Sequence, residues 1–530
     1  MSSLPQTMHR VLTIPELLDT IFKSLDNNSN LTNALVCRSW SEVALDALWR
    51  HVDDLHRLFN LLAPLRVKEG DLKQVEFSRL PESSDWKRFQ KYSKRVRELE
   101  YDESRHSPTL CQSVFDDIGR TRTSFAILPS VHTINWRAPL LLCVMFMYTN
   151  VKRFSIHLPD MIADVSPRPF FEDIANRMPR LTHIDIRTNI PIRKLEKDII
   201  RLLSSLPNLQ KVTTPRFYFT ASVATCLSHL PKLGCIEFQY YDEQGAGDPA
   251  DVTIFQPQLD EGAFPSLWDL SVTASYSDVQ RFLTIPFAPT NLTMLYIESP
   301  HLESPSDIHQ LLTAISENSQ MLKQLVLISP RRVDGASLIP ADASRTWKSS
   351  RNDGPRLKHL TSTLNPQLRL FRFDPRSPFP FAQHCPYLVY LGLFLNASVD
   401  LIPPSSASSV FPIFRRLQKL AMGLSVIDEH TPVASFLSQI LPSGCQIDSG
   451  IIWDETFELG SGHTNIVGRR YETWTKVNDL LPTLIQVRAE ERQRAEELRR
   501  ELNEVKERVR KLTEKWDIMV GSGDNYSISL

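Results

Sequence analysis

Apolar residues recur at helical spacing near the start of the chain. In residues 11–49, three short runs place apolar side chains three or four positions apart, with polar residues between the runs. This pattern is typical of amphipathic α-helices. The first run carries Leu17, Leu18, Ile21, Phe22 and Leu25, the second Leu31, Ala34 and Leu35, and the third Trp40, Val43, Ala44, Ala47 and Leu48. The pattern therefore predicts a three-helix module.

Local signals place the ends of these helices. Thr13 and Glu16 fit a capping box around Pro15, and Asn30 is the expected cap of the second helix. Helices this short are marginal alone in water, and about 40 residues make a marginal core. The module therefore needs a partner surface, which is either another protein or the rest of the chain. In the second case it is a plain helical cap on the domain behind it.

The apolar periodicity continues from Leu48 to Leu65 and predicts a connecting helix that docks the module onto the next domain. The longest continuous apolar run lies at residues 139–148. It is about half as long as a membrane span, so we expect a buried core element.

A second pattern repeats along most of the remaining chain. Its core is Leu-x-x-Leu-x-apolar, often preceded by proline, and copies recur about every 20 to 35 residues. The copies lie at residues 128–136, 148–156, 178–186, 206–214, 230–238, 264–272, 289–297, 319–327, 354–362, 385–393 and 414–422, with a degenerate first copy at 92–101. Apolar residues alternate within each copy, which predicts a short strand.

Helical stripes lie between the copies, for example at Leu195, Ile199 and Leu202. Strands that alternate with helices of this length predict parallel strands with helices on one side. One such unit cannot bury its own apolar face, so neighbouring units must stack as a solenoid. The alternative is a doubly wound α/β sheet, which so many copies of one short pattern disfavour. Two insertions, at residues 242–251 and 331–354, are expected to form surface loops.

The apolar spacing changes to heptads near the C-terminus. Ala495 is followed by residues spaced four and three apart in a highly charged segment: Leu498, Leu502, Val505, Val509, Leu512 and Trp516. The spacing predicts a helix over residues 471–516 with a seam of about three heptads. Three outcomes remain open: self-association or pairing with a partner helix, a lone charged helix, or packing back on the solenoid.

Charge and cysteine usage narrow the classes of function. The 530 residues include 60 Lys and Arg against 61 Asp and Glu. No overall basic field therefore favours nucleic acid or an acidic membrane. The seven cysteines are scattered, and the start lacks the apolar region of a secretory signal, so we expect a reducing compartment, cytoplasmic or nuclear. Without a phosphate loop or a metal-spaced histidine motif, we expect no catalytic residue, metal or cofactor.

The N-terminal run resembles an F-box. The matching features are the start Ile14-Pro15-Glu16-Leu17-Leu18, the positions of Ile21 and Leu25, the block Val36-Cys37-Arg38-Ser39-Trp40, and Trp49. Ile14 stands where the family pattern usually has leucine. The resemblance implies binding to a Skp-type adaptor, which bridges to a cullin. The implied adaptor-binding residues are Ile14, Pro15, Leu17, Leu18, Ile21, Leu25, Val36 and Trp40.

The repeat region resembles leucine-rich repeats of irregular length, although the Asn or Cys that ends a strict repeat is mostly absent. The whole chain is similar to F-box proteins with such regions in mushroom-forming fungi. A solenoid presents an extended concave strand face suited to gripping a macromolecule. For each residue on that face, the alternative is an ordinary solvated position. The expected substrate-binding residues are Asp185, Arg187, Glu237, Tyr241, Trp268, Tyr296 and Tyr390.

These patterns predict an α/β chain with an N-terminal three-helix F-box, an irregular leucine-rich-repeat-like solenoid of parallel strands with helices outside, and a long C-terminal helix. The expected segments are a disordered tail at 1–10, the F-box-like module at 11–50, a linker helix and connecting segment at 51–91, the solenoid with its cap at 92–470, the helix or short coiled coil at 471–516 and a flexible tail at 517–530.

The function expected from this organisation is a non-catalytic substrate receptor of a cullin-based (SCF-type) ubiquitin ligase. It would bind the adaptor through the F-box and an unidentified protein target through the solenoid. The alternative is a scaffold that binds a partner without driving its ubiquitination. Neither nucleic acid nor a membrane is an expected partner.

Overall fold

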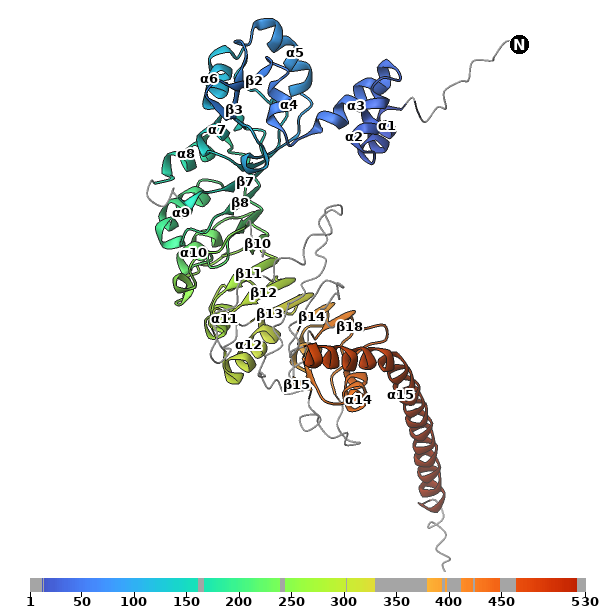
Figure 1. Cartoon of the computed structure of the whole chain (residues 1–530). Helices are drawn as coiled ribbons and strands as arrows, with labels where there is room; N and C mark the ends of the chain where they lie inside the picture. Colours follow the sequence, from blue (N-terminus) through green and yellow to red (C-terminus); the bar gives the residue numbers. More distant parts are fainter. Residues whose placement is uncertain are drawn as a thin grey trace, which may run out of the picture. The chain divides into compact units, whose positions relative to one another are not determined.

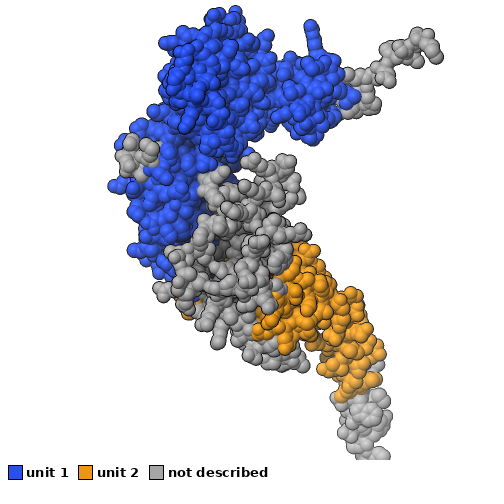
Figure 2. Space-filling model, in the orientation of Figure 1, with its two compact units in different colours: residues 1–303, 328–330, 337–355 blue, residues 304–327, 331–336, 356–530 orange. Residues whose placement is uncertain are grey.

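The computed structural model describes residue 12 and residues 14–160, 166–238, 244–301, 303–328, 379–392, 396–397, 411–422, 425–448 and 464–521. These fall into two compact units (Figure 2). The first takes in the described residues up to Glu303 and Ile328, and the second those from Ser304 to Leu327 and from 379 onward. An N-terminal helical module, parallel strands alternating with helices, and a long final helix confirm the predicted fold class.

Three helices form the N-terminal module: α1 (Pro15–Lys23), α2 (Asn27–Asn33) and α3 (Arg38–Arg50). Its core is small. Leu18, Phe22 and Ala44 are at most 2% exposed, and the Phe22 and Trp40 rings meet edge to face with 5.5 Å between centroids. A core of this size leaves other apolar residues of the module at its surface.

The helix ends differ from the predicted ones. Ile14, which offers no side-chain cap, precedes α1, so the expected capping box is wrong. Asp26 caps α2 in place of Asn30 and accepts the Ser29 amide at 3.2 Å. Asn30 lies inside α2, where its side-chain amide donates to the Phe22 carbonyl oxygen at 2.8 Å. That buried bond ties α2 to the end of α1.

The chain passes from α3 straight into the sheet. β1 (His51–Val52) follows α3 directly, and α4 (Leu55–Phe59) comes next. The predicted continuous helix over residues 48–65 is therefore wrong, although the apolar residues that suggested it are fully buried. The sheet also starts at β1, well before the predicted solenoid boundary at residue 92.

A parallel sheet forms the body of the first unit. Its strands, in spatial order, are β1, β4 (Glu98–Asp102), β6 (Thr133–Arg137), β7 (Arg153–His157), β8 (His183–Arg187), β9 (Lys211–Thr214), β10 (Cys235–Phe238), β11 (Asp269–Thr273) and β12 (Met294–Glu298). The spatial order follows the chain without a reversal, so the doubly wound alternative is wrong for this unit. A small separate sheet contains β2 (Leu65–Lys68), β3 (Asp71–Phe77) and β5 (Thr109–Leu110).

Helices connect the strands, and α8 to α11 lie along one side of the sheet (Figure 1). The helices of this unit after α4 are α5 (Ser83–Ser93), α6 (Gln112–Thr121), α7 (Leu140–Cys143), α8 (Arg168–Arg177), α9 (Glu196–Ser204), α10 (Ala221–Ser228) and α11 (Tyr276–Thr284). The apolar run at residues 139–148 contains α7 and is largely buried, as predicted.

One apolar position per strand forms a continuous ladder through each unit. Strand register places these residues side by side in the first unit: Val52, Leu99, Ile134, Phe154, Ile184, Val212, Ile236, Leu270 and Leu295. In the second unit the equivalent register joins Leu325, Leu391 and Leu420. None of them is more than 2% exposed. Burying each side chain contributes roughly 1.5–3 kcal/mol, and each is covered by its neighbours in adjacent strands.

The second unit continues the same alternation. Its elements are α12 (Pro305–Asn318), β13 (Gln324–Ile328), α13 (Phe379–His384), β14 (Tyr390–Gly392), β15 (Asn396–Ala397), β16 (Lys419–Ala421), β17 (Val426–Ile427), α14 (His430–Ile440), β18 (Gln446–Asp448) and α15 (Thr464–Gly521). Every predicted repeat copy that is described contains or overlaps a strand, whereas the copy at 354–362 lies outside the described residues.

The C-terminal helix is longer than predicted, and its first half packs back on the second unit. Trp474, Val477 and Leu481 are at most 1% exposed, and α15 lies against α14, β17 and β18. The heptad residues from Leu498 to Leu512, in its second half, are exposed. Among the described residues, none of the helices combines the length and apolar character that crossing a bilayer requires.

Truncating one ladder residue should be far more costly than truncating an exposed leucine. We expect Leu270→Ala to destabilise the folded protein by about 2–5 kcal/mol, because it opens a cavity between adjacent strands. Leu141→Ala is the matched control, since Leu141 is 80% exposed, and should stay within about 0.5 kcal/mol of the parent. Chemical denaturation followed by circular dichroism measures both, and equal losses would contradict the ladder as the main source of stability.

Candidate functional site

The outer face of α1 exposes a row of large apolar side chains. Ile14, Leu17, Ile21 and Leu25 are 37–41% exposed. Leu17 and Ile21 lie one turn apart on α1, and Ile14 and Leu25 lie just before and just after it. Leu18 and Phe22, on the adjacent side of α1, form the module's core. α1 is therefore apolar on two sides, and its own module covers only one of them.

The second helix adds exposed apolar residues that the sequence assignment missed. Leu31 is 55% exposed and Leu35, four residues later, is 87% exposed. Val36, which was predicted as a contact residue, is 52% exposed. The i, i+4 spacing of Leu31 and Leu35 was visible in the sequence, but nothing local distinguished a core pair from a surface pair.

Two of the predicted adaptor-binding residues pack in or against the module's core and do not belong to the exposed row. Leu18 is only 1% exposed and belongs to the module's core, so its assignment as a surface contact is wrong. Trp40 is partly buried against the same core, and its indole N–H donates to the Leu12 carbonyl oxygen at 3.0 Å. Both support the exposed row from beneath. Pro15 is exposed at the first position of α1.

Arg95 fastens the module to the body of the first unit. Its guanidinium pairs with the carboxylates of Glu42 and Asp46 on α3 and donates to the Glu42 carbonyl oxygen at 3.0 Å. Its side chain is 8% exposed, whereas Glu42 and Asp46 are largely exposed. The hydrogen bond from Arg95 lowers the pKa of Glu42. Trp49 and Tyr92 add a ring contact with 5.2 Å between centroids.

The strand face of the sheet carries polar residues that are paired with one another. Asp185 accepts hydrogen bonds from Arg187 at 2.8 Å and from the Gln244 side-chain amide at 3.0 Å. Gln244 is fully buried, so the predicted loop at 242–251 docks on β8 at this point. Gly245 (φ +78°) follows, and a Cβ there would lie 2.1 Å from the Thr188 carbonyl oxygen. Only glycine fits so close an approach.

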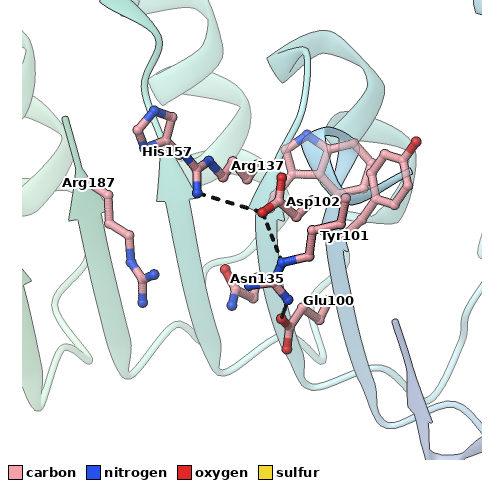
Figure 3. Close-up of a pocket in the computed structure, with 9 residues that line it drawn as sticks. Glu100, Tyr101, Asp102, Asn135, Arg137, His157 and Arg187 are labelled. Atoms are coloured by element: carbon pink, nitrogen blue, oxygen red, sulfur yellow. Dashed lines mark hydrogen bonds and ion pairs between the residues drawn. The ribbon is translucent and has the colours of Figure 1, made fainter. Parts of the chain in front are cut away.

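A small polar pocket lies where β4, β6, β7 and β8 end (Figure 3). Asp102 is its centre and pairs with Arg105 at 3.2 Å and with Arg137 at 3.7 Å. Burial, and then the nearby charge of Arg137, lower the pKa of His157, whose Nδ1 atom is buried without a hydrogen-bond partner. These groups can hold a polar or charged ligand through hydrogen bonds. The remaining lining residues are Glu100, Tyr101, Asn135, Trp136 and Arg187.

A second polar cluster spans β9, β10 and β11. Lys211 pairs with Glu237 at 2.7 Å, and the Cys235 thiol donates to Asp269 at 3.2 Å. Burial raises the pKa of Asp269 to about 6 and also raises the pKa of Cys235. Glu237, a predicted substrate-binding residue, is thus engaged within the chain, with 14% of its side chain exposed.

The predicted aromatic contact residues differ in accessibility. Trp268 is 49% exposed next to Gly234, where a Cβ would lie 2.6 Å from its indole nitrogen. Tyr296 is only 6% exposed and packs edge to face on Phe238, so its assignment as an outward contact is wrong. Burial raises the pKa of Tyr390 to about 12. Tyr241 lies outside the described residues.

Folding also gathers side chains that metals favour, which the sequence spacing did not predict. Asp54, His56 and His106 place ligand atoms within 4.8 Å of one another. His56 Nε2 donates to the Pro108 carbonyl oxygen at 2.9 Å, which leaves Nδ1 facing Asp54 at 3.3 Å. Two imidazoles and a carboxylate are a donor set that Zn²⁺ accepts. Cys235, Glu237 and Asp269 form a second such group, but Lys211 already pairs with its Glu237.

Comparison with known proteins agrees with the geometry of the N-terminal module. The F-box-like family model matches residues 15–54, which contain α1 to α3 and β1. A search of curated proteins found no match. Among solved structures, the chain is similar to "Crystal structure of TLR13-ssRNA13 complex", with 12% identity and a TM-score of 0.24. The alignment covers 78% of this chain and 63% of that one, less than two thirds of its length. A likeness this weak carries no argument.

The buried carboxyl group of Asp269 should make stability depend on pH. Its folded pKa, about 6, lies above its ordinary value of 3.8, so its contribution is most favourable below about pH 4 and is lost as pH rises through about 6. Because Asp269→Asn cannot ionise, its free energy of unfolding should rise relative to that of the parent by roughly 2–3 kcal/mol between pH 4 and pH 7. Denaturation midpoints over this range measure the gain. Asp260→Asn, at an 83% exposed carboxylate, is the control, and parallel pH profiles for parent and Asp269→Asn would contradict the assignment.

Proposed function

We propose that this chain is the substrate-receptor subunit of a cullin-based (SCF-type) ubiquitin ligase, acting in the cytoplasm or nucleus. It binds a Skp-type adaptor through its F-box and a target protein through its leucine-rich-repeat-like solenoid. The observation that carries the proposal is the exposed row Ile14, Leu17, Ile21 and Leu25, within the span that the F-box-like model matches. The family match by itself supports the more general conclusion that the chain takes part in protein–protein interaction.

The energetics of the row favour docking. Fully burying a large apolar side chain contributes about 1.5–3 kcal/mol, and each residue of the row, at 37–41% exposure, still has roughly two fifths of that burial to gain. Four of them on and beside α1, with Leu31, Leu35 and Val36 also exposed in the same module, form a group of anchors for a complementary protein surface. Leu18 and Phe22 hold α1 from behind, so the row is presented without first having to order itself.

The body of the chain supports a role in which binding, rather than chemistry, is the contribution. A receptor raises the effective concentration of a target near a carrier enzyme supplied by other subunits. The half-exposed Trp268 and the pocket around Asp102 are contact points of the kind that a protein target needs. The arrangement of Arg95 with Glu42 and Asp46 couples the F-box to the first strands of the sheet.

A non-ligase scaffold is the second candidate, and it would use the same surfaces. The two functions differ in outcome: only a ligase receptor changes the turnover of its bound protein. Copurification of a cullin together with the adaptor would favour the receptor.

The adaptor surface can be tested by a paired substitution. We expect Leu17→Ala with Ile21→Ala to abolish capture of a purified Skp-type adaptor, since central apolar anchors cost about 2 kcal/mol or more each when truncated. Because both residues are exposed, helicity and melting temperature should stay close to those of the parent.

The matched control is Leu72→Ala with Leu141→Ala, at two leucines that are 84% and 80% exposed elsewhere in the chain. This variant should capture the adaptor as the parent does. Unchanged adaptor recovery by the folded Leu17/Ile21 variant would show that the row is not the adaptor surface.

A further inference from the structure

The two halves of α15 have different surroundings. In the first half, the Trp474 indole N–H donates to the Ser425 carbonyl oxygen at 2.8 Å, and the Arg492 guanidinium donates to the Gln439 carbonyl oxygen at 2.9 Å. From Gln493 to Glu514, every residue is exposed. Figure 1 shows this second half extending away from α14. Nothing else among the described residues covers it.

The exposed half carries a continuous apolar seam. We call Leu498, Leu502, Val505, Val509 and Leu512 the C-terminal seam. Its members are 52–66% exposed. Their four-three alternation places two residues of each heptad on one narrow line, with Leu502 and Val509 at a positions and the others at d positions. A two-in-seven line is the geometry that a partner helix fills, whereas a helix lying on a membrane presents a broader apolar face.

The charges are segregated around this seam. The flanking e and g positions carry mostly basic residues: Arg494, Arg499, Lys506 and Arg508, against one acidic residue, Glu501, and one neutral residue, Thr513. The outward positions carry most of the acids: Glu496, Glu497, Glu504, Glu507 and Glu514. Outward pairs such as Arg510 with Glu507 at 2.7 Å support the lone helix. The flanking cations therefore face whatever docks on the seam.

We infer that the C-terminal seam is a docking site for an α-helix of another protein, one whose own apolar a and d line is flanked by acidic residues. Cations at e and g set partner choice by pairing with acids across the interface. This site is separate from the F-box row and does not depend on the proposed ligase function.

A second copy of this chain fits the seam poorly. In a parallel pair, Arg494 of one copy would face Arg499 of the other, and only the contact between Glu501 and Lys506 would be favourable. In an antiparallel pair centred on the seam, Arg499 would face Lys506, and only the contact between Glu501 and Arg508 would be favourable. An acidic flank on the partner removes these repulsions and pairs all four cations.

The direct test uses the purified full chain and two synthetic helices of about three heptads, both with leucine at a and d. One carries glutamate at e and g and the other carries lysine there. We expect the glutamate helix to bind at least about tenfold more tightly at low salt, with the difference shrinking as salt rises. Leu502→Asp with Val509→Asp should abolish binding without loss of the fold, because both residues are exposed.

Charge reversal distinguishes ion pairing across the interface from nonspecific apolar association. Arg499→Glu with Lys506→Glu should reverse the preference toward the lysine helix. The matched control, Arg500→Glu with Lys511→Glu, reverses two charges on the outward face and should leave the preference unchanged.

Three results would overturn the inference. In the first, the parent dimerises in a concentration-dependent way in analytical ultracentrifugation, Leu502→Asp with Val509→Asp abolishes the dimer, and the parent shows no preference between the two helices. That result would assign the seam to a second copy. Another is sedimentation with phosphatidylserine-containing vesicles but not with either helix, which would assign it to a lipid surface. The third is binding to neither helix.

Discussion

Stacking of one buried apolar residue per strand is the interaction on which the body of this protein depends. In the first unit the ladder runs from Val52 to Leu295, and each member contacts the equivalent residue of the next strand through strand register. A single strand and helix could not exclude water from such a residue, since the neighbouring repeats supply part of its cover. Stability is therefore shared along the array, and irregular spacing between copies is tolerated because only the ladder position must match.

The N-terminal module, in contrast, does not bury all of its large apolar residues. Its core of Leu18, Phe22 and Ala44 is too small to enclose the apolar residues that its helices carry. Direct continuity of α3 with β1, together with the contacts of Arg95, attaches it to the sheet of the first unit. That attachment allows the module to keep an exposed apolar row, which a free domain of about 40 residues could hardly sustain. The same attachment makes the row a fixed feature of the first unit.

The polar side chains of the strand face are paired with one another within the chain. Asp185 with Arg187, Lys211 with Glu237, and Asp102 with Arg105 satisfy one another before any partner arrives. The target that we propose would have to replace these pairs or add to them, so its selection would depend on charge matching more than on apolar area. Trp268 differs from these paired polar residues, because it is an exposed aromatic side chain. It lies just before β11 and next to Gly234, whose lack of a side chain leaves room for the indole ring.

The sequence by itself determined the recurring features of this protein: the repeat copies and their strands, the three N-terminal helices with their F-box-like pattern, and the heptad line of α15. These depend on periodicity, which is a local property of the chain. Only the tertiary structure decided that Leu18 is buried while Leu17 is exposed, because both faces of α1 are apolar and periodicity cannot say which face the chain itself covers. Tertiary packing likewise buried Tyr296, brought His106 beside His56 and divided α15 into an anchored half and an exposed half. Each of these outcomes depends on residues distant in sequence, whose approach is set by the stacking of the sheet and by the packing of α14 against α15.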